Sequence, residues 1–314
     1  MSKILVVGTG LFGSALINIL LFNKHEIYAY GTNAEQINDF KNGISVFKNK
    51  FYSKLKFASN DLEKIMENNY DIILLALPKI FLTDTVKKIL SYNKCANAIF
   101  VSTVKGRSDI ENISDIQLVH LFGPSYANEV YNFKTTIVNI VSKNESALKK
   151  VKKAFDNQYF HCVINRDLVG ALMLPFLKNM GAIGMGMVYS LTDSINTRAW
   201  CFTRMLDEFK TLVKNNGGDV NSLTDYCGIG DIYLTCLHSD SRNFSFGCEV
   251  VKLGVQEAVK KNNSNVEGYQ AYIDAKPLIT DKKNGCVFLR AVYNILFNKG
   301  STSELIDVIF ASCK

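Results

Sequence analysis

The stretch ILVVGTGLFG, residues 4–13, decides the fold that this sequence predicts. Its first four residues are apolar and predict a buried strand, and its glycines have the spacing G-x-G-x-x-G where a helical pattern begins. Gly8 permits a tight turn, Gly10 lets backbone approach a pyrophosphate, and Gly13 lets the helix lie close to the strand. Alone the motif is weak evidence. Because a second strand is predicted at residues 27–30, a dinucleotide site is favoured over a purely structural turn.

Short apolar runs alternate with helical patterns along the first half of the chain. The runs lie at residues 71–77, 98–102, 118–121, 136–141 and 160–164. This alternation is typical of a mostly parallel sheet covered by helices. Farther on, long helical patterns begin at Leu168, Arg198, Phe244 and Cys286. The sequence therefore predicts an α/β fold, with an N-terminal Rossmann-type doubly wound sheet that binds a dinucleotide (residues 1–165) and a C-terminal all-helical substrate-binding domain (residues 166–314).

The composition is typical of a globular protein that binds small molecules. With 314 residues, 47% of them hydrophobic, the chain is long enough for two domains with buried cores. Its formal net charge of +7 favours anionic small molecules. The lysines at 149, 150, 152 and 153 predict the solvated face of one helix, so we expect no nucleic-acid partner.

The cysteines indicate a reducing compartment. Eight cysteines are scattered along the chain without a C-x-x-C pair, and no secretory signal is evident. We expect reduced thiols in the cytoplasm, and no metal site. Cys227 and Cys236 are expected to be packing residues rather than nucleophiles, because the nearest histidine, His238, has no evident orienting partner.

Two apolar stretches raise the question of a membrane. Residues 4–23 carry no charge, but the three glycines of the turn and the single preceding Lys3 argue against a signal peptide or a membrane helix. Residues 168–191 contain Pro175 and Lys178 near the middle, where a charge costs roughly 2.5 to 3.5 kcal/mol on insertion scales. We expect this second stretch to be a buried helix, and we expect no membrane insertion.

A polar stretch near residue 230 combines groups that suit catalysis and anion binding. It reads GIGDIYLTCLHSDSRNFSFG, residues 228–247. If a helix begins at Asp231, Thr235 lies on the same face. Arg242 and Asn243 would open a second helix, whose free N–H groups favour a phosphate. The alternative is a polar helix–turn–helix corner without chemistry.

Two lysines occupy unusual positions. Lys178 interrupts an apolar helical pattern, and a buried ammonium group either finds a carboxylate partner or loses basicity. Glycines at 181, 184 and 186 each weaken that helix by roughly 1 kcal/mol, which suggests that something must approach closely. The alternative is a surface lysine that extends its charged end into water. Lys105 directly follows a predicted strand, where ligands of open α/β sheets bind.

Motifs in a fixed order resemble one family over nearly the whole chain, the bacterial NAD(P)-dependent glycerol-3-phosphate dehydrogenases. The motifs are GTGLFG, TVKG, GPSYANE, LKNMGAIGMGM, NTRAWCFTR, GIGDIYLTC, SRNFSFG and VEGY. Each is modest alone, but the ordered series is hard to obtain by chance. The resemblance implies a reversible reduction of dihydroxyacetone phosphate by NADH or NADPH. The product, sn-glycerol 3-phosphate, is the backbone precursor of glycerophospholipids.

The resemblance also implies roles for individual residues. Lys178 would be the general acid, held in place by Asp231, and Lys105 would add a second positive charge near the substrate and the nicotinamide. The substrate-binding residues implied are Lys105, Gly123, Ser125, Asn179, Thr235, Ser241, Arg242 and Asn243. The cofactor-binding residues implied are Gly8, Gly10, Leu11, Phe12, Gly13, Thr32, Lys105, Ala127, Arg242 and Glu267.

The sequence departs from the family pattern at a few positions. Phe12 stands where the family often has a larger aromatic residue, and Asn128 where a lysine is common. The second strand ends in GTN, residues 31–33, without a carboxylate for a ribose 2′-hydroxyl or an arginine for a 2′-phosphate. Glu35 is expected to be a first-turn acid of the next helix. The choice between NAD and NADP therefore stays open.

Several other residues are expected to be structural. His120 is interpreted as a core or pocket-wall histidine, because no carboxylate is evidently placed to orient it. Trp200 and the methionines are interpreted as packing residues, and Arg198 and Arg204 as residues that support the site or an interface. The alternative functions are a related dehydrogenase of a hydroxy acid or sugar acid, and a dinucleotide sensor without catalysis. The oligomeric state stays open, a homodimer included.

Overall fold

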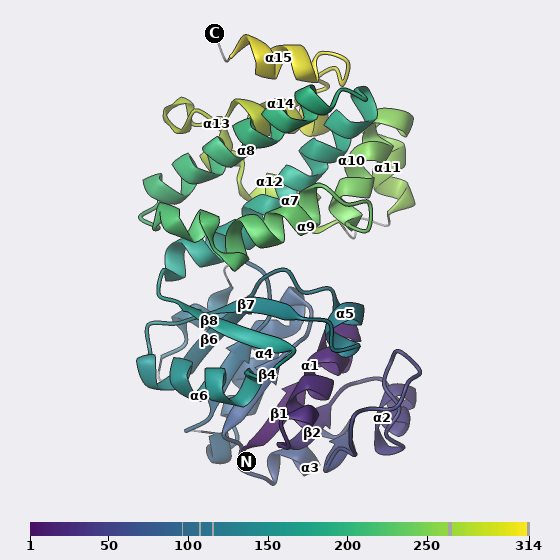
Figure 1. The fold of residues 1–314 in the computed structure, drawn as a ribbon, viewed down its shortest axis with the longest axis vertical. Coiled ribbons are helices and arrows are strands. Elements are labelled where there is room, and N and C mark those ends of the chain that lie inside the picture. The colour runs from purple at the N-terminus through teal and green to yellow at the C-terminus, as the bar shows by residue number, and fades with distance from the viewer. Residues whose placement is uncertain (96, 107, 115, 263–265, 313–314) are drawn as a thin grey trace. The chain divides into compact units, whose positions relative to one another are not determined.

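A computed structural model describes residues 1–95, 97–106, 108–114, 116–262 and 266–312 (Figure 1). The chain divides into two compact units, Met1–Leu168 and Val169–Lys314. The division lies close to the boundary that we expect from the sequence at residues 165 and 166. We describe each unit by itself.

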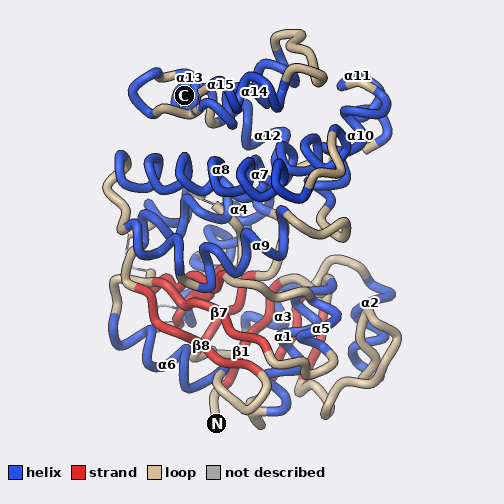
Figure 2. Tube along the Cα trace, turned by 45° about the horizontal axis from the view of Figure 1, so that its top comes forward, coloured by secondary structure: helices blue, strands red, loops and turns tan. Residues whose placement is uncertain are grey.

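The first unit contains one eight-stranded sheet in the order β3-β2-β1-β4-β5-β6-β7-β8 (Figure 2). Its strands are β1 (Lys3–Val7), β2 (Glu26–Tyr30), β3 (Phe57–Ser59), β4 (Ile72–Leu75), β5 (Ile99–Ser102), β6 (Gln117–Phe122), β7 (Thr136–Val141) and β8 (Phe160–Asn165). All neighbouring strands are parallel except β6 and β7. The predicted Rossmann-type sheet is confirmed, but the sequence patterns missed β3.

Helices cover both faces of this sheet. They are α1 (Leu11–Phe22), α2 (Ala34–Lys41), α3 (Leu62–Met66), α4 (Lys79–Leu90), α5 (Ala127–Tyr131) and α6 (Glu145–Phe155). Because side chains alternate along a strand, Ile4 and Val6 pack in the core beneath α1 and α6, while Leu5 and Val7 pack in the core beneath α3 and α4. The strands therefore have buried residues on both sides, as a doubly wound sheet requires.

The described residues of the second unit form helices and no strand. They are α7 (Leu168–Leu191, which begins in the last residue of the first unit), α8 (Ile195–Asn215), α9 (Asp231–Cys236), α10 (Arg242–Leu253), α11 (Val255–Lys261), α12 (Glu267–Asp274), α13 (Lys276–Thr280), α14 (Val287–Phe297) and α15 (Leu305–Ala311). The predicted all-helical domain is confirmed. Helix α8 begins before the expected Arg198, because the Ser194 side chain accepts a hydrogen bond from the Thr197 N–H group and caps it.

Helix α7 forms the centre of the helical domain. Its length and apolar composition would suit a membrane span, but 78% of its most apolar window is buried inside the protein. A Cβ atom at Gly184 would overlap the Phe288 ring, and one at Gly186 would overlap the Phe244 backbone carbonyl. The expected close approach is therefore that of neighbouring helices, α14 and α10, which pack against α7 at these glycines. The prediction of a buried helix is confirmed.

A buried carboxylate joins two helices of this domain. Glu208 of α8 is 2% exposed and accepts hydrogen bonds from the backbone N–H groups of Val287, Phe288 and Leu289 at 2.8, 2.7 and 3.1 Å. These N–H groups open α14 and have no partner within their own helix. Arg204 lies 3.3 Å from Glu208 and partly compensates its charge. One side chain thus caps α14 and fixes it to α8.

Candidate active site

The glycine turn after β1 has the geometry of a pyrophosphate-binding loop. Gly8 has φ of +108°, and a Cβ atom there would overlap the Ala76 carbonyl. A Cβ atom at Gly13 would overlap the carbonyl of Gly8, so both positions require glycine. At Gly10, in contrast, an added Cβ atom would meet nothing within 4 Å, which leaves the start of α1 open. The turn therefore fits the diphosphate of a dinucleotide at the N-terminus of α1.

The end of β2 contacts the same turn. Thr9 donates a hydrogen bond from its hydroxyl to Gln36 in α2 at 2.9 Å. Asn33 caps α2, since its side-chain oxygen accepts from the Gln36 N–H group at 3.0 Å. Thr32 is exposed beside it, and Glu35 lies in the first turn of α2 as expected. The Asn33 oxygen is thus engaged within the fold, and the Thr32 hydroxyl is available at the position where Rossmann domains bind the adenosine ribose.

The other predicted residues of the N-terminal domain lie at the same edge of the sheet. Lys105 follows β5 and is exposed, and Gly123 follows β6. The Ser125 hydroxyl donates to the Gly123 carbonyl at 3.1 Å, and Ala127 begins α5. Because β1, β4, β5 and β6 are parallel, their carboxyl ends share one edge. Ligands of open α/β sheets bind at that edge.

In the helical domain, Lys178 and Asp231 form a buried ion pair. Lys178 of α7 is 0% exposed and Asp231, the first residue of α9, is 4% exposed. The Lys178 Nζ atom contacts Asp231 Oδ2. A buried charge is costly unless an opposite charge compensates it. Of the two outcomes expected for a buried Lys178, a carboxylate partner or lost basicity, the structure shows the partner, Asp231, that the resemblance implies, and the alternative of a surface lysine is wrong.

A second polar group surrounds Glu267, the first residue of α12. Asn179, next to Lys178, donates to Glu267 Oε2 at 3.0 Å. Arg242, the first residue of α10, approaches Glu267 Oε1 at 3.9 Å. Both members of this second pair are largely exposed, so their attraction is weak and a ligand can replace it. The helical domain thus brings together Asn179, which the resemblance assigns to the substrate, Glu267, which it assigns to the cofactor, and Arg242, which it assigns to both.

The remaining predicted residues of the helical domain already have partners within the fold. Ser241 caps α10, with its hydroxyl oxygen accepting from the Phe244 N–H group at 3.3 Å. Asn243 accepts from the Gly268 N–H group at 2.9 Å, and Thr235 donates to the Asp231 carbonyl at 2.7 Å. The predicted helix starts at Asp231 and Arg242 are both confirmed. Arg242 itself is exposed, and it lies at the N-terminus of α10, next to the capping residue Ser241.

His120 has a carboxylate neighbour that the sequence did not reveal. Glu111 Oε1 lies 3.6 Å from His120 Nε2, so the expectation that no carboxylate would be placed beside His120 is wrong. Glu111 belongs to a capping box with Ser108, a local pattern that signals a helix start but says nothing of a distant strand. Burial lowers the pKa of His120 to about 4, and it raises the pKa of Glu111. His120 is therefore a neutral core histidine at pH 7.

The residues interpreted as structural pack or bond within the helical domain. Arg198 donates to the Thr192 carbonyl at 3.0 Å and stacks on the Tyr189 ring at 4.0 Å. The Trp200 ring lies 5.8 Å from that of Phe310. The four methionines interpreted as packing residues, Met173, Met180, Met185 and Met187, are buried, and Arg204 pairs with Glu208 as described above. These contacts stabilise helix packing.

The described cysteines are free thiols. Cys227 and Cys236 are buried, and burial raises the pKa of Cys236, which makes it a poor nucleophile. Cys313 lies outside the described residues. Within the described part of the chain, no three histidine, cysteine, aspartate or glutamate side chains gather as metal ligands would.

A Rossmann-type domain with an open glycine turn, followed by an all-helical domain that buries a lysine–aspartate pair, defines a nicotinamide-dependent oxidoreductase. The profile described as NAD-dependent glycerol-3-phosphate dehydrogenase N-terminus matches residues 3–148, and the C-terminus profile of the same family matches residues 167–307. The chain belongs to the NAD-dependent glycerol-3-phosphate dehydrogenase family.

Individual relatives agree with this assignment. The chain is 30% identical to a glycerol-3-phosphate dehydrogenase [NAD(P)+] of Malacoplasma penetrans, over 96% of this chain and 94% of the relative. It is also 30% identical to the protein of that name from Mesoplasma florum, over 100% and 99%. The crystal structure of glycerol-3-phosphate dehydrogenase from Coxiella burnetii shares the fold, with a TM-score of 0.84 at 23% identity over 98% of each chain.

Proposed function

We propose that this enzyme reduces dihydroxyacetone phosphate to sn-glycerol 3-phosphate with NADH or NADPH, and that Lys178 is the proton donor. Membership of the family supports the reaction and the cofactor. The buried ion pair of Lys178 and Asp231 supports the assignment of the proton donor. The product is the backbone precursor of glycerophospholipids, which places the enzyme in phospholipid biosynthesis.

The proposed chemistry follows from the ammonium group of Lys178. The glycine turn would hold the reduced dinucleotide, whose nicotinamide would supply a hydride to the carbonyl carbon of the substrate. Lys178 donates a proton to the carbonyl oxygen as negative charge develops there, and Asp231 keeps the ammonium group oriented. In the reverse direction the neutral amine of Lys178 accepts the proton of the hydroxyl. Lys105 adds positive charge that stabilises the developing alkoxide.

The phosphate of the substrate is assigned to the start of α10. Arg242 presents an exposed guanidinium there, and guanidinium groups bind phosphate with two parallel hydrogen bonds. The helix N-terminus adds partial positive charge, and Asn243 and Ser241 add polar side chains. Asn179 and Thr235 are assigned to the substrate hydroxyls. The residues assigned to the wall of the substrate pocket are Gly123, Ser125 and Ala127.

The cofactor is assigned to the glycine turn. Gly8, Gly10, Leu11, Phe12 and Gly13 are assigned to the diphosphate, and the exposed Thr32 is assigned to the adenosine ribose. Lys105, Ala127, Arg242 and Glu267 are assigned to further contacts with the cofactor. We also propose a cytoplasmic location, which the free thiols support. A homodimer stays a hypothesis, and light scattering tests it because a dimer has twice the mass of the monomer.

A spectrophotometric assay tests the proposed reaction. Dihydroxyacetone phosphate should oxidise NADH or NADPH, whereas unphosphorylated dihydroxyacetone should be a far poorer substrate. Binding of the reduced dinucleotide without turnover would favour a sensor, and turnover of a 2-oxo acid would favour a hydroxy-acid dehydrogenase. Measurement of kcat/KM with each reduced nicotinamide assigns the cofactor preference.

A further inference from the structure

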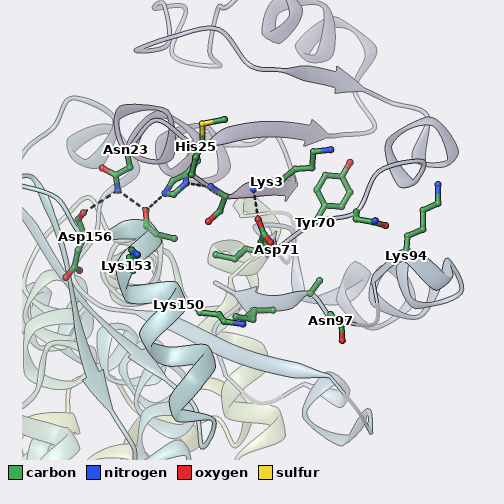
Figure 3. Close-up of a pocket in the computed structure, with 17 residues that line it drawn as sticks. Lys3, Asn23, His25, Tyr70, Asp71, Lys94, Asn97, Lys150, Lys153 and Asp156 are labelled. Atoms are coloured by element: carbon green, nitrogen blue, oxygen red, sulfur yellow. Dashed lines mark hydrogen bonds between the residues drawn. The ribbon is translucent and has the colours of Figure 1, made fainter.

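A cavity lies at the amino-terminal ends of strands β1, β4 and β5, whereas the glycine turn follows the carboxyl end of β1 (Figure 3). It has a volume of about 1070 Å³, comparable to the upper end of ligand sites. Its wall includes Lys3, Ile72 and Ile99, the first residues of β1, β4 and β5. The glycine turn follows the last residue of β1, so β1 alone separates the two positions by about 13 Å. The cavity is therefore distinct from the dinucleotide site.

Lysines outnumber acids in this cavity. The charged lining residues are Lys3, Lys94, Lys150, Lys153, Asp71 and Asp156, apart from the chain terminus. Figure 3 shows Lys150 and Lys153 on α6, and Lys94 on the other side of the cavity. The four lysines thus line a cavity from different sides and do not form a flat basic patch on the surface. A hollow of this kind suits a small molecule more than a nucleic-acid backbone.

Both acids of the cavity are engaged by the fold. Asp156 Oδ2 lies 2.6 Å from the ammonium group of Lys152, and its other oxygen accepts from the Cys162 N–H group at 2.7 Å. Asp71 accepts from the Lys3 backbone N–H group at 2.8 Å. These carboxylates hold the chain in place. Asp156 is paired with Lys152, and the other carboxylate, Asp71, is outnumbered by the four lysines of the lining.

These four lysines have no carboxylate partner among the ion pairs of the described residues. Lys3 donates to Asn68 Oδ1 at 3.1 Å, and Lys94 donates to the Glu67 carbonyl at 2.6 Å, both neutral acceptors. Lys150 and Lys153 are exposed and three residues apart, so they lie on one face of α6. Lys153 also suits the C-terminal end of the helix dipole, but Lys150 lies farther from that end.

The wall that carries these lysines is fixed by polar contacts. The Ser2 N–H group donates to His25 Nδ1 at 3.0 Å, so Nε2 carries the proton and donates to the Ala154 carbonyl at 3.0 Å. Burial lowers the pKa of His25, which keeps this ring neutral at pH 7. Asn23 donates to the carbonyls of Ala154 and Phe155 at 2.8 and 3.0 Å. The end of α6 is thus held against the end of α1, and the His25 ring serves as a structural contact of the cavity wall.

We propose that this cavity binds a small polyanion, a molecule that carries two or more phosphate groups. Two or more anionic groups would let one ligand contact lysines from different sides of the cavity, which a single phosphate could not do. Asn69 and Asn97 in the lining add side-chain amides for further hydrogen bonds. The site is separate from the reaction proposed above and does not depend on it.

Calorimetric titration with inorganic tripolyphosphate tests this site. The full-length enzyme is first saturated with oxidised cofactor and dihydroxyacetone phosphate, which occupy the active site without turnover. We expect the double variant Lys150→Glu and Lys153→Glu to bind tripolyphosphate at least about tenfold more weakly, because two attractive contacts become repulsive. The matched control is Lys149→Glu, an exposed lysine of the same helix outside the cavity, which should stay within about twofold of the unchanged enzyme.

Three further measurements show whether tripolyphosphate binds in this cavity or elsewhere on the enzyme. The neutral double variant Lys150→Ala and Lys153→Ala gives the same comparison if the charge-reversed protein fails to fold. The variant Arg242→Ala should bind tripolyphosphate as tightly as the unchanged enzyme, because Arg242 does not line this cavity. This expectation holds whether or not Arg242 binds the phosphate of the substrate. Turnover should be unchanged in the lysine variants. Equal affinity in all variants, or no binding to the unchanged enzyme, would overturn the proposal.

Discussion

At Lys178 the chain places an ammonium group where solvent does not reach it, against the carboxylate of Asp231. Such a pair is a weak source of stability, because loss of water around both charges offsets much of their attraction. In the proposed reaction the value of the pair is positional, since a lysine held by a carboxylate would keep one orientation relative to the substrate carbonyl. The cost of an isolated buried charge predicted that Lys178 would need a partner or lose basicity, but Asp231 as that partner was implied only by the family resemblance.

The substitution Lys178→Ala should lower kcat by roughly 10² to 10⁴, which is the usual contribution of a general acid. Steady-state turnover of dihydroxyacetone phosphate measures the effect. The matched control is Lys210→Ala, which removes an exposed lysine from α8 and should leave kcat unchanged. Near-normal turnover in the Lys178 variant would contradict its role as the proton donor.

The substitution Arg242→Ala should weaken the binding of the phosphorylated substrate by roughly 1.5 to 3 kcal/mol, the range for hydrogen bonds to charged groups. The comparison of kcat/KM for dihydroxyacetone phosphate with that for dihydroxyacetone measures it. Lys252→Ala, in the last turn of the same helix, serves as the control. An equal loss with both substrates would show that Arg242 does not recognise the phosphate.

His120 should make the protein less stable in acid. Its pKa in the folded protein is about 4, below the ordinary 6.5, so between these values the unfolded chain binds more protons. Stability attributable to His120 is complete above pH 6.5 and decreases as the pH falls toward 4, by about 3 kcal/mol in all. Denaturant unfolding at pH 7 and pH 5 measures this loss. His120→Phe should show a smaller loss over that interval, and an unchanged loss would exclude His120 as its source.

The approach of Glu111 to His120 shows why contacts between distant residues could not be predicted. Glu111 reaches the strand from a short helical turn, and no local pattern links a loop carboxylate to a particular strand residue. Asn179 and Glu267 are similarly far apart in the chain and meet only through the packing of α7 and α12. Residue chemistry predicted which groups need partners, but the partners depend on tertiary structure.

At the level of elements, the local sequence pattern was enough to locate a strand wherever several apolar residues were consecutive. Strands β1, β2 and β4 to β8 could be located from such runs, and α9 and α10 from their polar first residues. Strand β3 could not, because it has three residues and begins with the exposed Phe57. The capping of α14 by Glu208 could not be predicted either, because Glu208 is 79 to 81 positions before the N–H groups that it binds.

The contact between α7 and α10 should depend on Gly186. An alanine there would normally stabilise a helix by about 1 kcal/mol. In this helix its Cβ atom would overlap the Phe244 carbonyl, so we expect Gly186→Ala to destabilise the protein by about 1 to 3 kcal/mol. Thermal or denaturant unfolding measures the change. A stabilised variant would show that the two helices can move apart without cost.

For the whole molecule, the net charge of +7 should increase the rate at which anionic substrates associate with the enzyme. We expect kcat/KM for dihydroxyacetone phosphate to fall severalfold between about 0.01 and 0.5 M salt, because the screening length shortens over this range. Uncharged dihydroxyacetone, assayed at saturating cofactor, provides the control and should respond much less. If kcat/KM fell equally with salt for both substrates, salt would be acting on the protein itself and not on the attraction of the substrate phosphate.

The burial of Lys178 has a consequence for inhibitor design. Acylating reagents dissolved in bulk water will modify the many surface lysines first, because its nitrogen is covered by protein atoms and paired with a carboxylate. A covalent inhibitor of this amine therefore needs an electrophile carried on a compound that enters as the natural triose phosphate does. Its selectivity would then come from recognition of the carrier instead of from intrinsic amine reactivity.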